Sequence, residues 1–430
     1  MKLMNAKGTR DFGPEDKILR NEVVEKLKIV FERYGYSPLE TPIIERMELL
    51  SAKAGAGEEA DASKETFKLT DQGARNLGLR FELTLSFSRF IGMNPTLKMP
   101  FKRYEFGPVF RDGPIKLGRY RQFWQCDVDV VGSKNMAVDA EILALALDGF
   151  KALKLDAYLE INNRKILKGI IEFAGIKPSL ADSVIISIDK LQKIGKDEVR
   201  KELELKKIND TAIAKLLSAF DVQGNNKEKL GMLKQILQNE IGQEGVKELE
   251  EVFSYLNDEQ MNKVKFNVSL ARGLAYYTGT IFEGFMTKSK VTSSICGGGR
   301  YDEMIPKLLS TEKEYPAIGI SFGLDVINDV LKLENKAIKK TVAHVYLIPI
   351  KTSNECFKII QELRDAGIKA DMDISGRGIS KNLDFVNTYD IPFAIIVGPK
   401  ELEEEKITLR DMNSGEESKI TIKEAIKKLK

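Results

Sequence analysis

Polar and apolar residues alternate along two neighbouring stretches of the chain, residues 101–111 and 119–132, which are separated by a short segment with Gly113 and Pro114. Alternation with a period of two predicts β-strands, and glycine and proline between them predict a turn. We therefore expect a hairpin here. In its second strand the period places one set of side chains on the same face: Arg121, Phe123, Gln125, Asp127 and Asp129.

A helical pattern marks other parts of the first 330 residues. Pro14, Glu15 and Asp16 are typical of a first helical turn, and apolar residues three or four apart follow until Gly35. The next segment, GYSPLETPII, is expected to be a strand. Residues 164–263 are charged and helical in pattern, with little β-branched alternation, which predicts an inserted helical domain.

The last part of the chain alternates buried strands with helices, beginning with the apolar run VAHVYLIPI. This order is typical of a parallel α/β domain with crossover helices. We therefore divide the chain into a main domain with two parts, an insertion, a linker and a C-terminal domain. The boundaries are 1–163 and 264–332 for the main domain, 164–263 for the insertion, 333–340 for the linker and 341–430 for the C-terminal domain.

Composition narrows the class of protein. No apolar run reaches the length of a membrane span and the N-terminal segment lacks an apolar signal core, so we expect a cytoplasmic protein without a membrane partner. Cys126, Cys296 and Cys356 are too widely separated to suggest a disulfide framework or a zinc cluster. The single histidine, His344, lies in an apolar run, which argues against histidine-based acid, base or metal chemistry.

Three arginines of the hairpin, Arg111, Arg119 and Arg121, are expected to lie close together. Guanidinium groups on rigid strands suit phosphate, because their planar fork binds two oxygens at once and stays charged. The alternative is a solvated hairpin whose arginines form surface ion pairs. The hairpin alone predicts an anion site but leaves this alternative open.

Three further segments carry candidate chemistry. LARGLAYYTGTIFE contains Arg272, Tyr276 and Tyr277, and CGGGRYD contains three glycines that would let a flat group approach the backbone closely. In LRFELT, Glu82 and Thr84 fall on the same face of an expected strand. Taken singly, each segment is better explained by packing than by function.

Taken in order, these segments resemble the histidyl-tRNA synthetases. The match covers nearly the whole chain apart from the insertion. Its segments are KGTRDFGPED at Lys7, LRFELT at Leu79, FRD and GRYRQFWQCDVD from Phe110, RGLAYYTGTIFE at Arg272, GGGRYD at Gly297 and PAIGISFGLD at Pro316. The resemblance implies an α+β catalytic domain, with the antiparallel sheet and flanking helices of class II synthetases, and a C-terminal α/β anticodon-binding domain. It also implies a homodimer, with Pro42 in the motif used for dimer packing.

The resemblance further implies ATP-dependent ligation of L-histidine to histidine tRNA through a histidyl-adenylate, with release of AMP and pyrophosphate. ATP is then a substrate and Mg²⁺ a cofactor whose ligands the sequence does not identify. Arg111 and Arg272 match catalytic arginines on either side of the α-phosphate. Arg119 matches an arginine that reaches the outer phosphates of ATP.

The same comparison implies how histidine is bound. Glu82, Thr84 and Gln125 match acceptors for the α-ammonium group. Asp129 and Tyr277 match the pair that contacts the imidazole, which in its neutral form has one donor and one acceptor nitrogen. The remaining residues expected at the histidine are Arg272, Tyr276 and Tyr301. For the last two, ordinary aromatic packing is the alternative.

Two positions depart from the family pattern. Its third motif normally ends in GLxR, whereas Val326 stands at the arginine position here, and Ala275 replaces a common aspartate. This keeps open a non-catalytic regulatory subunit of ATP phosphoribosyltransferase, although such relatives usually lack the anticodon-binding domain and lose the histidine and ATP motifs. A scaffolding or RNA-binding relative would be expected to lose Glu82 and Tyr277, which are present.

Overall fold

The computed structural model describes residues 2–52, 65–115, 119–272, 276–334 and 338–430. The chain forms two compact units, Met1–Arg10 with Val23–Glu334 and Asp11–Glu22 with Asn335–Lys430. Ala275 and part of the expected linker 333–340 lie outside the described residues. The domain boundaries proposed from the sequence stay predictions.

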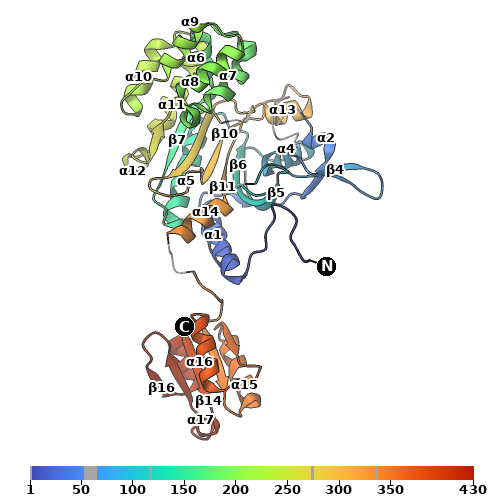
Figure 1. Ribbon diagram of the computed structural model, residues 1–430, viewed down its shortest axis with the longest axis vertical. Coiled ribbons are helices and arrows are strands. Elements are labelled where there is room, and N and C mark those ends of the chain that lie inside the picture. Colours follow the sequence, from blue (N-terminus) through green and yellow to red (C-terminus); the bar gives the residue numbers. More distant parts are fainter. Residues whose placement is uncertain (1, 53–64, 116–118, 273–275, 335–337) are drawn as a thin grey trace. The chain divides into compact units, whose positions relative to one another are not determined.

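An eight-stranded sheet forms the centre of the first unit (Figure 1). From one edge to the other, its strands are β1 (Ser37–Pro38), β5 (Phe101–Phe110), β6 (Gln122–Val131), β11 (Ala317–Gly323), β10 (Cys296–Arg300), β9 (Thr280–Met286), β7 (Ala157–Asn163) and β8 (Val264–Phe266). The six inner strands pair with one another in antiparallel fashion, and each edge strand pairs in parallel with its inner neighbour. This confirms the expected fold class. The order brings the hairpin β5–β6 next to β11, which lies almost 200 residues further along the chain.

Helices and a small second sheet surround this centre. They are α1 (Pro14–Arg33), α2 (Met47–Leu50), α4 (Leu83–Met93), α5 (Met136–Leu153), α13 (Met304–Leu309), α14 (Leu324–Leu333) and the strands β2 (Ile44–Arg46), β4 (Asn76–Leu79) and β3 (Lys68–Thr70). Phe31 of α1 is fully buried, and its ring packs against those of Phe106 and Phe322 with centroids 5.7 and 5.8 Å apart. This aromatic contact joins α1 to the sheet.

One strand prediction was wrong in this region, and another is confirmed only in part. The segment that contains Glu82 and Thr84 is not a strand, because Leu83, Phe87 and Ile91 recur every four residues and bury one face of helix α4. Glu82 is the residue at the N-cap of that helix. The strand expected in GYSPLETPII is reduced to Ser37–Pro38, and Pro42 lies in the connection to β2. Proline offers no backbone N–H to a sheet, so it interrupts the pairing.

Residues 164–261 form a group of helices at one end of the first unit (Figure 1). They are α6 (Arg164–Phe173), a 3₁₀ turn (Pro178–Leu180), α7 (Ala181–Ile188), α8 (Leu191–Leu205), α9 (Asp210–Ala219), α10 (Asn226–Ile236), α11 (Glu240–Tyr255) and α12 (Asp258–Met261). Asparagine side chains cap the N-termini of several of them, as Asn163 does for α6 and Asn239 for α11. Helices α6 and α11 cross so closely that a Cβ on Gly169 would lie only 2.5 Å from the Cα of Gly242. Glycine is therefore the residue that fits at this crossing.

The second unit contains a five-stranded sheet. Its strands in spatial order are β13 (Ala370–Met372), β12 (Val345–Pro349), β14 (Phe393–Val397), β15 (Ile407–Asp411) and β16 (Glu417–Ile420), and its helices are α15 (Ser353–Asp365), α16 (Ile379–Thr388), α17 (Pro399–Glu403) and α18 (Ile422–Leu429). The expected parallel pairing holds for β13, β12 and β14, whereas β15 and β16 are antiparallel. A short turn with Gly415 at positive φ joins the last two strands, and only antiparallel strands can be joined in this way.

His344 also belongs to the second unit, where its ring packs edge-on against Phe393 at 5.3 Å. It therefore lies outside every motif that carries candidate chemistry. Among the described helices, none combines the length and the apolar character needed to cross a bilayer.

Candidate active site

A narrow cavity of about 70 Å³ opens on one face of the central sheet, where β6, β10 and β11 lie beside the start of α4. It gathers residues that are far apart in the sequence. The predicted residues that line it are Glu82, Thr84, Arg111, Gln125, Asp129, Arg272, Tyr276, Tyr277 and Tyr301. Arg119 is not among the residues that line it. The glycines 297–299, expected to let a flat group approach, and Asp127, placed on the same face as Gln125, line it as well, although neither was named as a site residue. Sequence reasoning left out Gly319, Ile320 and Ser321.

Hydrogen-bond acceptors meet at one part of the cavity wall. Glu82 accepts a hydrogen bond from the Tyr276 hydroxyl at 3.3 Å, and burial raises the pKa of this carboxyl group to about 7. Gln125 donates from Nε2 to the Ser321 hydroxyl at 2.8 Å, which leaves its buried Oε1 without a hydrogen-bond partner among the described residues. A carboxyl group and a free amide oxygen are suitable acceptors for an ammonium group.

The glycines of β10 make room for the residues around the cavity. A Cβ on Gly297 would lie 1.7 Å from Nη1 of Arg272, and one on Gly298 would lie 2.0 Å from the carbonyl oxygen of Gly319. The triple glycine was expected to let a flat group approach the backbone. At Gly297 that group is the guanidinium of Arg272. Any larger residue at 297 would displace that side chain.

Arg272 is held in an unusual backbone conformation, with φ at +52°. A non-glycine residue at positive φ costs free energy, and such strain often occurs at functional sites. Its Nη1 donates to the carbonyl of Phe282 at 3.1 Å and pairs with Oε1 of Glu283 at 3.2 Å. These contacts fix the guanidinium at the cavity wall.

Arg111 lies directly after β5 and is held between two aromatic rings. The centre of its guanidinium is 4.3 Å from the ring centroid of Phe81 and 5.0 Å from that of Phe123. Its Nε donates to the carbonyl of Phe81 at 3.4 Å, and its terminal nitrogens make no hydrogen bond with any residue that the structure describes. The stacking orients the planar fork and leaves it available for an anion.

The other two hairpin arginines have different partners. Arg119 donates from Nη2 to both carboxylate oxygens of Glu65, at 2.9 and 3.0 Å, and its side chain is 41% exposed. Arg121 pairs with Asp112 at 2.9 Å. Arg119 and Arg121 thus form ion pairs, as the alternative interpretation of the hairpin expected. Arg111, in contrast, faces the cavity.

At the inner end of the cavity, Asp129 is bonded on both sides. Its Oδ1 accepts a hydrogen bond from the Tyr301 hydroxyl at 2.5 Å, and its Oδ2 lies 2.7 Å from Nη2 of Arg103. All three side chains are buried, and burial raises the pKa of the Asp129 carboxyl group. Arg103 was missed in the sequence. The register of the hairpin could have identified it, because that register places Arg103 opposite Asp129 and Glu105 opposite Asp127.

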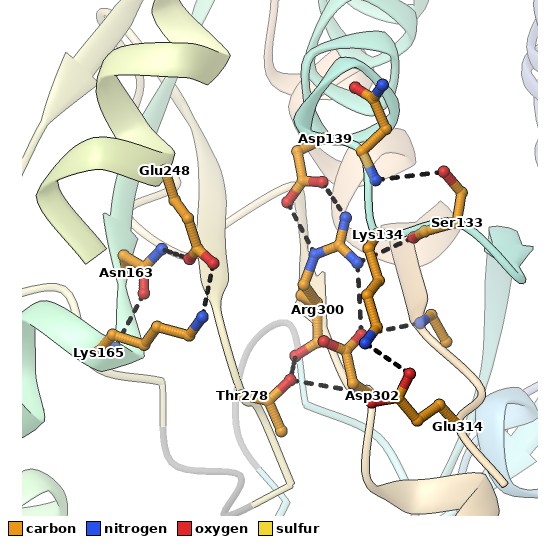
Figure 2. A network of polar contacts seen from close by, with 12 residues as sticks. Ser133, Lys134, Asp139, Asn163, Lys165, Glu248, Thr278, Arg300, Asp302 and Glu314 are labelled. Carbon is orange, nitrogen blue, oxygen red and sulfur yellow. Dashed lines mark hydrogen bonds and ion pairs between the residues drawn. The ribbon is translucent and has the colours of Figure 1, made fainter. Parts of the chain in front are cut away.

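Figure 2 shows a polar network around Arg300, a residue that does not itself line the cavity. Arg300 binds the carboxylate of Asp139, donates to the carbonyl of Ser133 at 3.1 Å and lies 3.4 Å from Asp302. The backbone N–H of Thr278 donates to the carbonyl of Arg300 at 2.8 Å. Since Tyr277 and Tyr301 are the chain neighbours of Thr278 and Arg300, this network fixes both residues at the cavity.

The position of the missing arginine lies at the start of α14. Val326 is half-buried there, and its neighbour Asp325 accepts hydrogen bonds from Arg10 at 2.6 Å and from the backbone N–H of Trp124 at 2.9 Å. Asp325 thus joins the N-terminal segment and β6 to this helix. Because residue 326 is valine, this position carries no positive charge.

Comparison with known proteins agrees with this geometry. Residues 8–327 match the family described as histidyl-tRNA synthetase, and residues 344–430 match the anticodon binding domain. A histidine–tRNA ligase 1 of Bacillus cereus is 42% identical over 428 residues, which is 98% of each chain. The histidine–tRNA ligase of Clostridium tetani is 33% identical over 434 residues, which is 98% of this chain and 97% of that protein.

Two solved structures show the same fold. The histidyl-tRNA synthetase of Nostoc sp. PCC 7120 has a TM-score of 0.87 at 29% identity and covers 100% of this chain and 99% of its own. A Bacillus halodurans protein described as an ATP phosphoribosyltransferase regulatory subunit/histidyl-tRNA synthetase has a TM-score of 0.75 at 20% identity, over 93% and 99% of the two chains. The second likeness concerns the fold alone. On the family match and the full-length identity, this chain belongs to the histidyl-tRNA synthetase family.

Proposed function

We propose that this protein ligates L-histidine to histidine tRNA, with a histidyl-adenylate formed from ATP as the intermediate. The observation that carries the proposal is the composition of the single cavity described above. It presents acceptors for an ammonium group, buried polar groups for a ring with hydrogen-bonding nitrogens, and two arginines for phosphate. These are the groups that histidine and ATP require when they react with each other.

In the first step, a carboxylate oxygen of histidine attacks the α-phosphorus of ATP. The new O–P bond replaces the bond to the bridging oxygen, and pyrophosphate leaves with that electron pair. Arg111 and Arg272 both reach the cavity, so they can neutralise the two anions that must meet and the charge that develops on the α-phosphate. Because the carboxylate is already ionised, the step needs positioning and charge stabilisation rather than a histidine base.

Histidine is oriented by its two polar ends. Its ammonium group is placed against Glu82, Thr84 and Gln125, where the acceptors converge. Its ring enters the inner part of the cavity, between Tyr277 and the carboxyl groups of β6. Tyr276 bonds Glu82 and Tyr301 bonds Asp129, so both tyrosines position acidic groups as well as enclosing the ring.

In the second step, a hydroxyl of the terminal adenosine of the tRNA attacks the activated carbonyl carbon, and AMP leaves. The match of residues 344–430 to an anticodon binding domain supports a role of the second unit in tRNA binding. A cytoplasmic homodimer remains part of the proposal on the family resemblance.

A magnesium ion is also proposed from the resemblance. The described residues contain no group of three or more acidic, histidine or cysteine side chains that could hold a metal ion. We assign no step to a metal. Magnesium commonly binds through phosphate oxygens with few protein ligands, so it would arrive with ATP.

The test is amino-acid-dependent exchange between ATP and labelled pyrophosphate. We expect exchange with histidine and no comparable exchange with the other amino acids. Binding of histidine without exchange would favour the regulatory-subunit alternative, for which the missing arginine at Val326 is the specific observation.

A further inference from the structure

Arg164, the first residue of α6, is a buried arginine that does not line the cavity. Its side chain is 2% exposed, and its Nε has no hydrogen-bond partner among the described residues. Its Nη2 pairs with Oδ1 of Asp182 at 3.2 Å, but the side chain of Asp182 is 65% exposed. A buried cation is costly unless it is well paired, so this ion pair alone does not account for the arginine.

The other contacts of Arg164 fall on both sides of the segment that carries the proposed catalytic arginine. Its Nη1 donates to the carbonyl of Ala271, directly before Arg272, at 3.3 Å. Its backbone N–H donates to the carbonyl of Gly279, two residues after Tyr277, at 2.8 Å. One residue thus holds the chain before Arg272 and after Tyr277, both of which line the cavity.

The contact with Ala271 restrains the strained backbone of Arg272. A peptide group is planar, so a hydrogen bond to the carbonyl of Ala271 also fixes the backbone nitrogen of Arg272. The rotation about the bond from that nitrogen to Cα is the φ of +52°, a conformation that persists only where the surroundings enforce it. Asn162 holds the same segment through the carbonyl of Leu270, at 2.8 Å. Ala271 is fully buried, so water does not compete for its carbonyl.

The chain neighbours of Arg164 keep it in place (Figure 2). Asn163 donates from Nδ2 to Oε2 of Glu248 in α11 at 2.7 Å, and Nζ of Lys165 donates to Oε1 of the same carboxylate at 2.5 Å. Strand β7 ends at Asn163 and α6 begins at Arg164. Arg164 is therefore fixed at the point where the group of helices 164–261 joins the central sheet.

We propose that Arg164 is a positioning residue for adenylate formation, which holds Arg272 at the cavity wall through the carbonyl of Ala271. This inference rests on the proposed function, in which Arg272 acts on the α-phosphate of ATP. Because a displacement of about 1 Å can cost about two orders of magnitude in rate, loss of the contact slows adenylate formation. Histidine binding changes much less. The N–H that binds Gly279 belongs to the backbone, so a side-chain substitution leaves that contact in place.

The experiment is a double-variant cycle, measured by single-turnover formation of histidyl-adenylate. It compares the wild type, Arg164→Met, Arg272→Ala and the variant with both changes, because methionine keeps an unbranched apolar stem without the guanidinium. We expect Arg164→Met to lower the rate about tenfold or more in the wild-type background and less than about twofold in the Arg272→Ala background. Arg164→Lys, which keeps a charged donor, should recover part of the rate.

Arg89→Met is the matched control. Arg89 is a half-buried arginine of α4 that donates to both carboxylate oxygens of Glu45 and does not line the cavity. This substitution also removes a guanidinium from a carboxylate, so it can cost stability, but it should leave the rate of adenylate formation unchanged. Thermal unfolding shows whether each variant folds, and Arg164→Gln replaces Arg164→Met if the methionine variant does not.

Equal losses from Arg164→Met in the two backgrounds would overturn the inference, because they would indicate a general effect on the fold. A wild-type rate in the folded variant would overturn it as well. A crystal structure of Arg164→Met reads the positioning without an activity assay: we expect Arg272 to have moved away from Glu283, and an unmoved Arg272 would contradict the role. A wild-type protein without histidine-dependent pyrophosphate exchange would instead contradict the proposed function, which separates the two failures.

Discussion

The two ends of the cavity are built differently. At the inner end, Asp129, Tyr301 and Arg103 are buried and bonded to one another. At the outer end, the terminal nitrogens of Arg111 make no hydrogen bond with the described residues, and Arg119, which does not itself line the cavity, is 41% exposed and paired with Glu65. The inner end is organised before any ligand binds. At the outer end, Arg111 has terminal nitrogens available for a ligand, whereas Arg119 would have to exchange Glu65 for one.

This difference separates two tasks. A preorganised polar site discriminates between similar side chains, because a wrong ligand leaves buried groups unpaired. Each guanidinium that contacts a phosphate adds charge-assisted hydrogen bonds to ATP binding, and here Val326 stands where the family pattern has one such cation. We therefore expect changes at the inner end to alter amino-acid selection, and changes at the outer end to alter the requirement for ATP.

The largest effect is expected for Arg272, whose guanidinium is fixed at the cavity wall. Arg272→Ala should lower the rate of adenylate formation by roughly two orders of magnitude or more, because it removes charge stabilisation at the reacting phosphate. Histidine binding should change much less. Arg272→Lys should also be poor, because an ammonium group does not reproduce the guanidinium fork. Single-turnover kinetics with calorimetric histidine binding checks both statements, and a loss confined to histidine binding would contradict the role.

A smaller effect is expected at the inner end. Tyr277→Phe should weaken histidine activation by about 1–3 kcal/mol, since it removes one hydroxyl from the ring site and leaves the aromatic packing. The measurement is kcat/KM for histidine and for competing amino acids. Tyr346→Phe, in the buried core of the second unit, is a matched control and should leave both values unchanged. If discrimination is also unchanged in Tyr277→Phe, this residue does not contact the imidazole.

The acceptor end should respond to pH. Burial raises the pKa of Glu82 to about 7, so below that pH the carboxyl group is largely protonated and attracts an ammonium group poorly. Histidine binding should strengthen as the pH rises through about 7. Free histidine titrates its own ring near this range, so the difference between the wild-type and Glu82→Gln profiles is the relevant quantity. Parallel profiles for the two proteins would contradict the assignment.

The smallest and most local effect concerns the outer end. Arg119→Ala should raise the KM for ATP, and Val326→Arg should partly reverse that increase if its side chain reaches the phosphates. The four-way comparison of wild type, single variants and double variant measures the coupling between the two positions. If Arg119→Ala leaves the ATP dependence unchanged, the outer phosphates are bound elsewhere.

Much of this arrangement could be predicted from the sequence. The period of two between Phe101 and Val131 predicted the hairpin, and it placed Gln125, Asp127 and Asp129 on one face, which the structure lines up along the cavity. The resemblance supplied Glu82, Thr84, Arg111, Arg272 and the three tyrosines of the cavity. Their approach to one another depends on β6 pairing with β11, a contact that local periodicity does not contain.

The contacts of individual side chains could not be predicted in the same way, because their partners are distant in the sequence. Glu82 was expected on a strand, on the same face as Thr84, although the recurrence of Leu83, Phe87 and Ile91 indicated a helix. The pairing of Arg119 with Glu65 and the filling of the space over Gly297 by Arg272 follow only from tertiary structure. Side-chain roles were therefore harder to predict than the strands that carry them.

The most direct test of two separate ends is a two-substrate kinetic measurement on Tyr277→Phe and Arg119→Ala, with KM determined for both histidine and ATP. We predict that Tyr277→Phe raises the KM for histidine and leaves that for ATP nearly unchanged, and that Arg119→Ala does the reverse. If both constants rise together in both variants, the two ends act as one unit and the division of tasks is wrong.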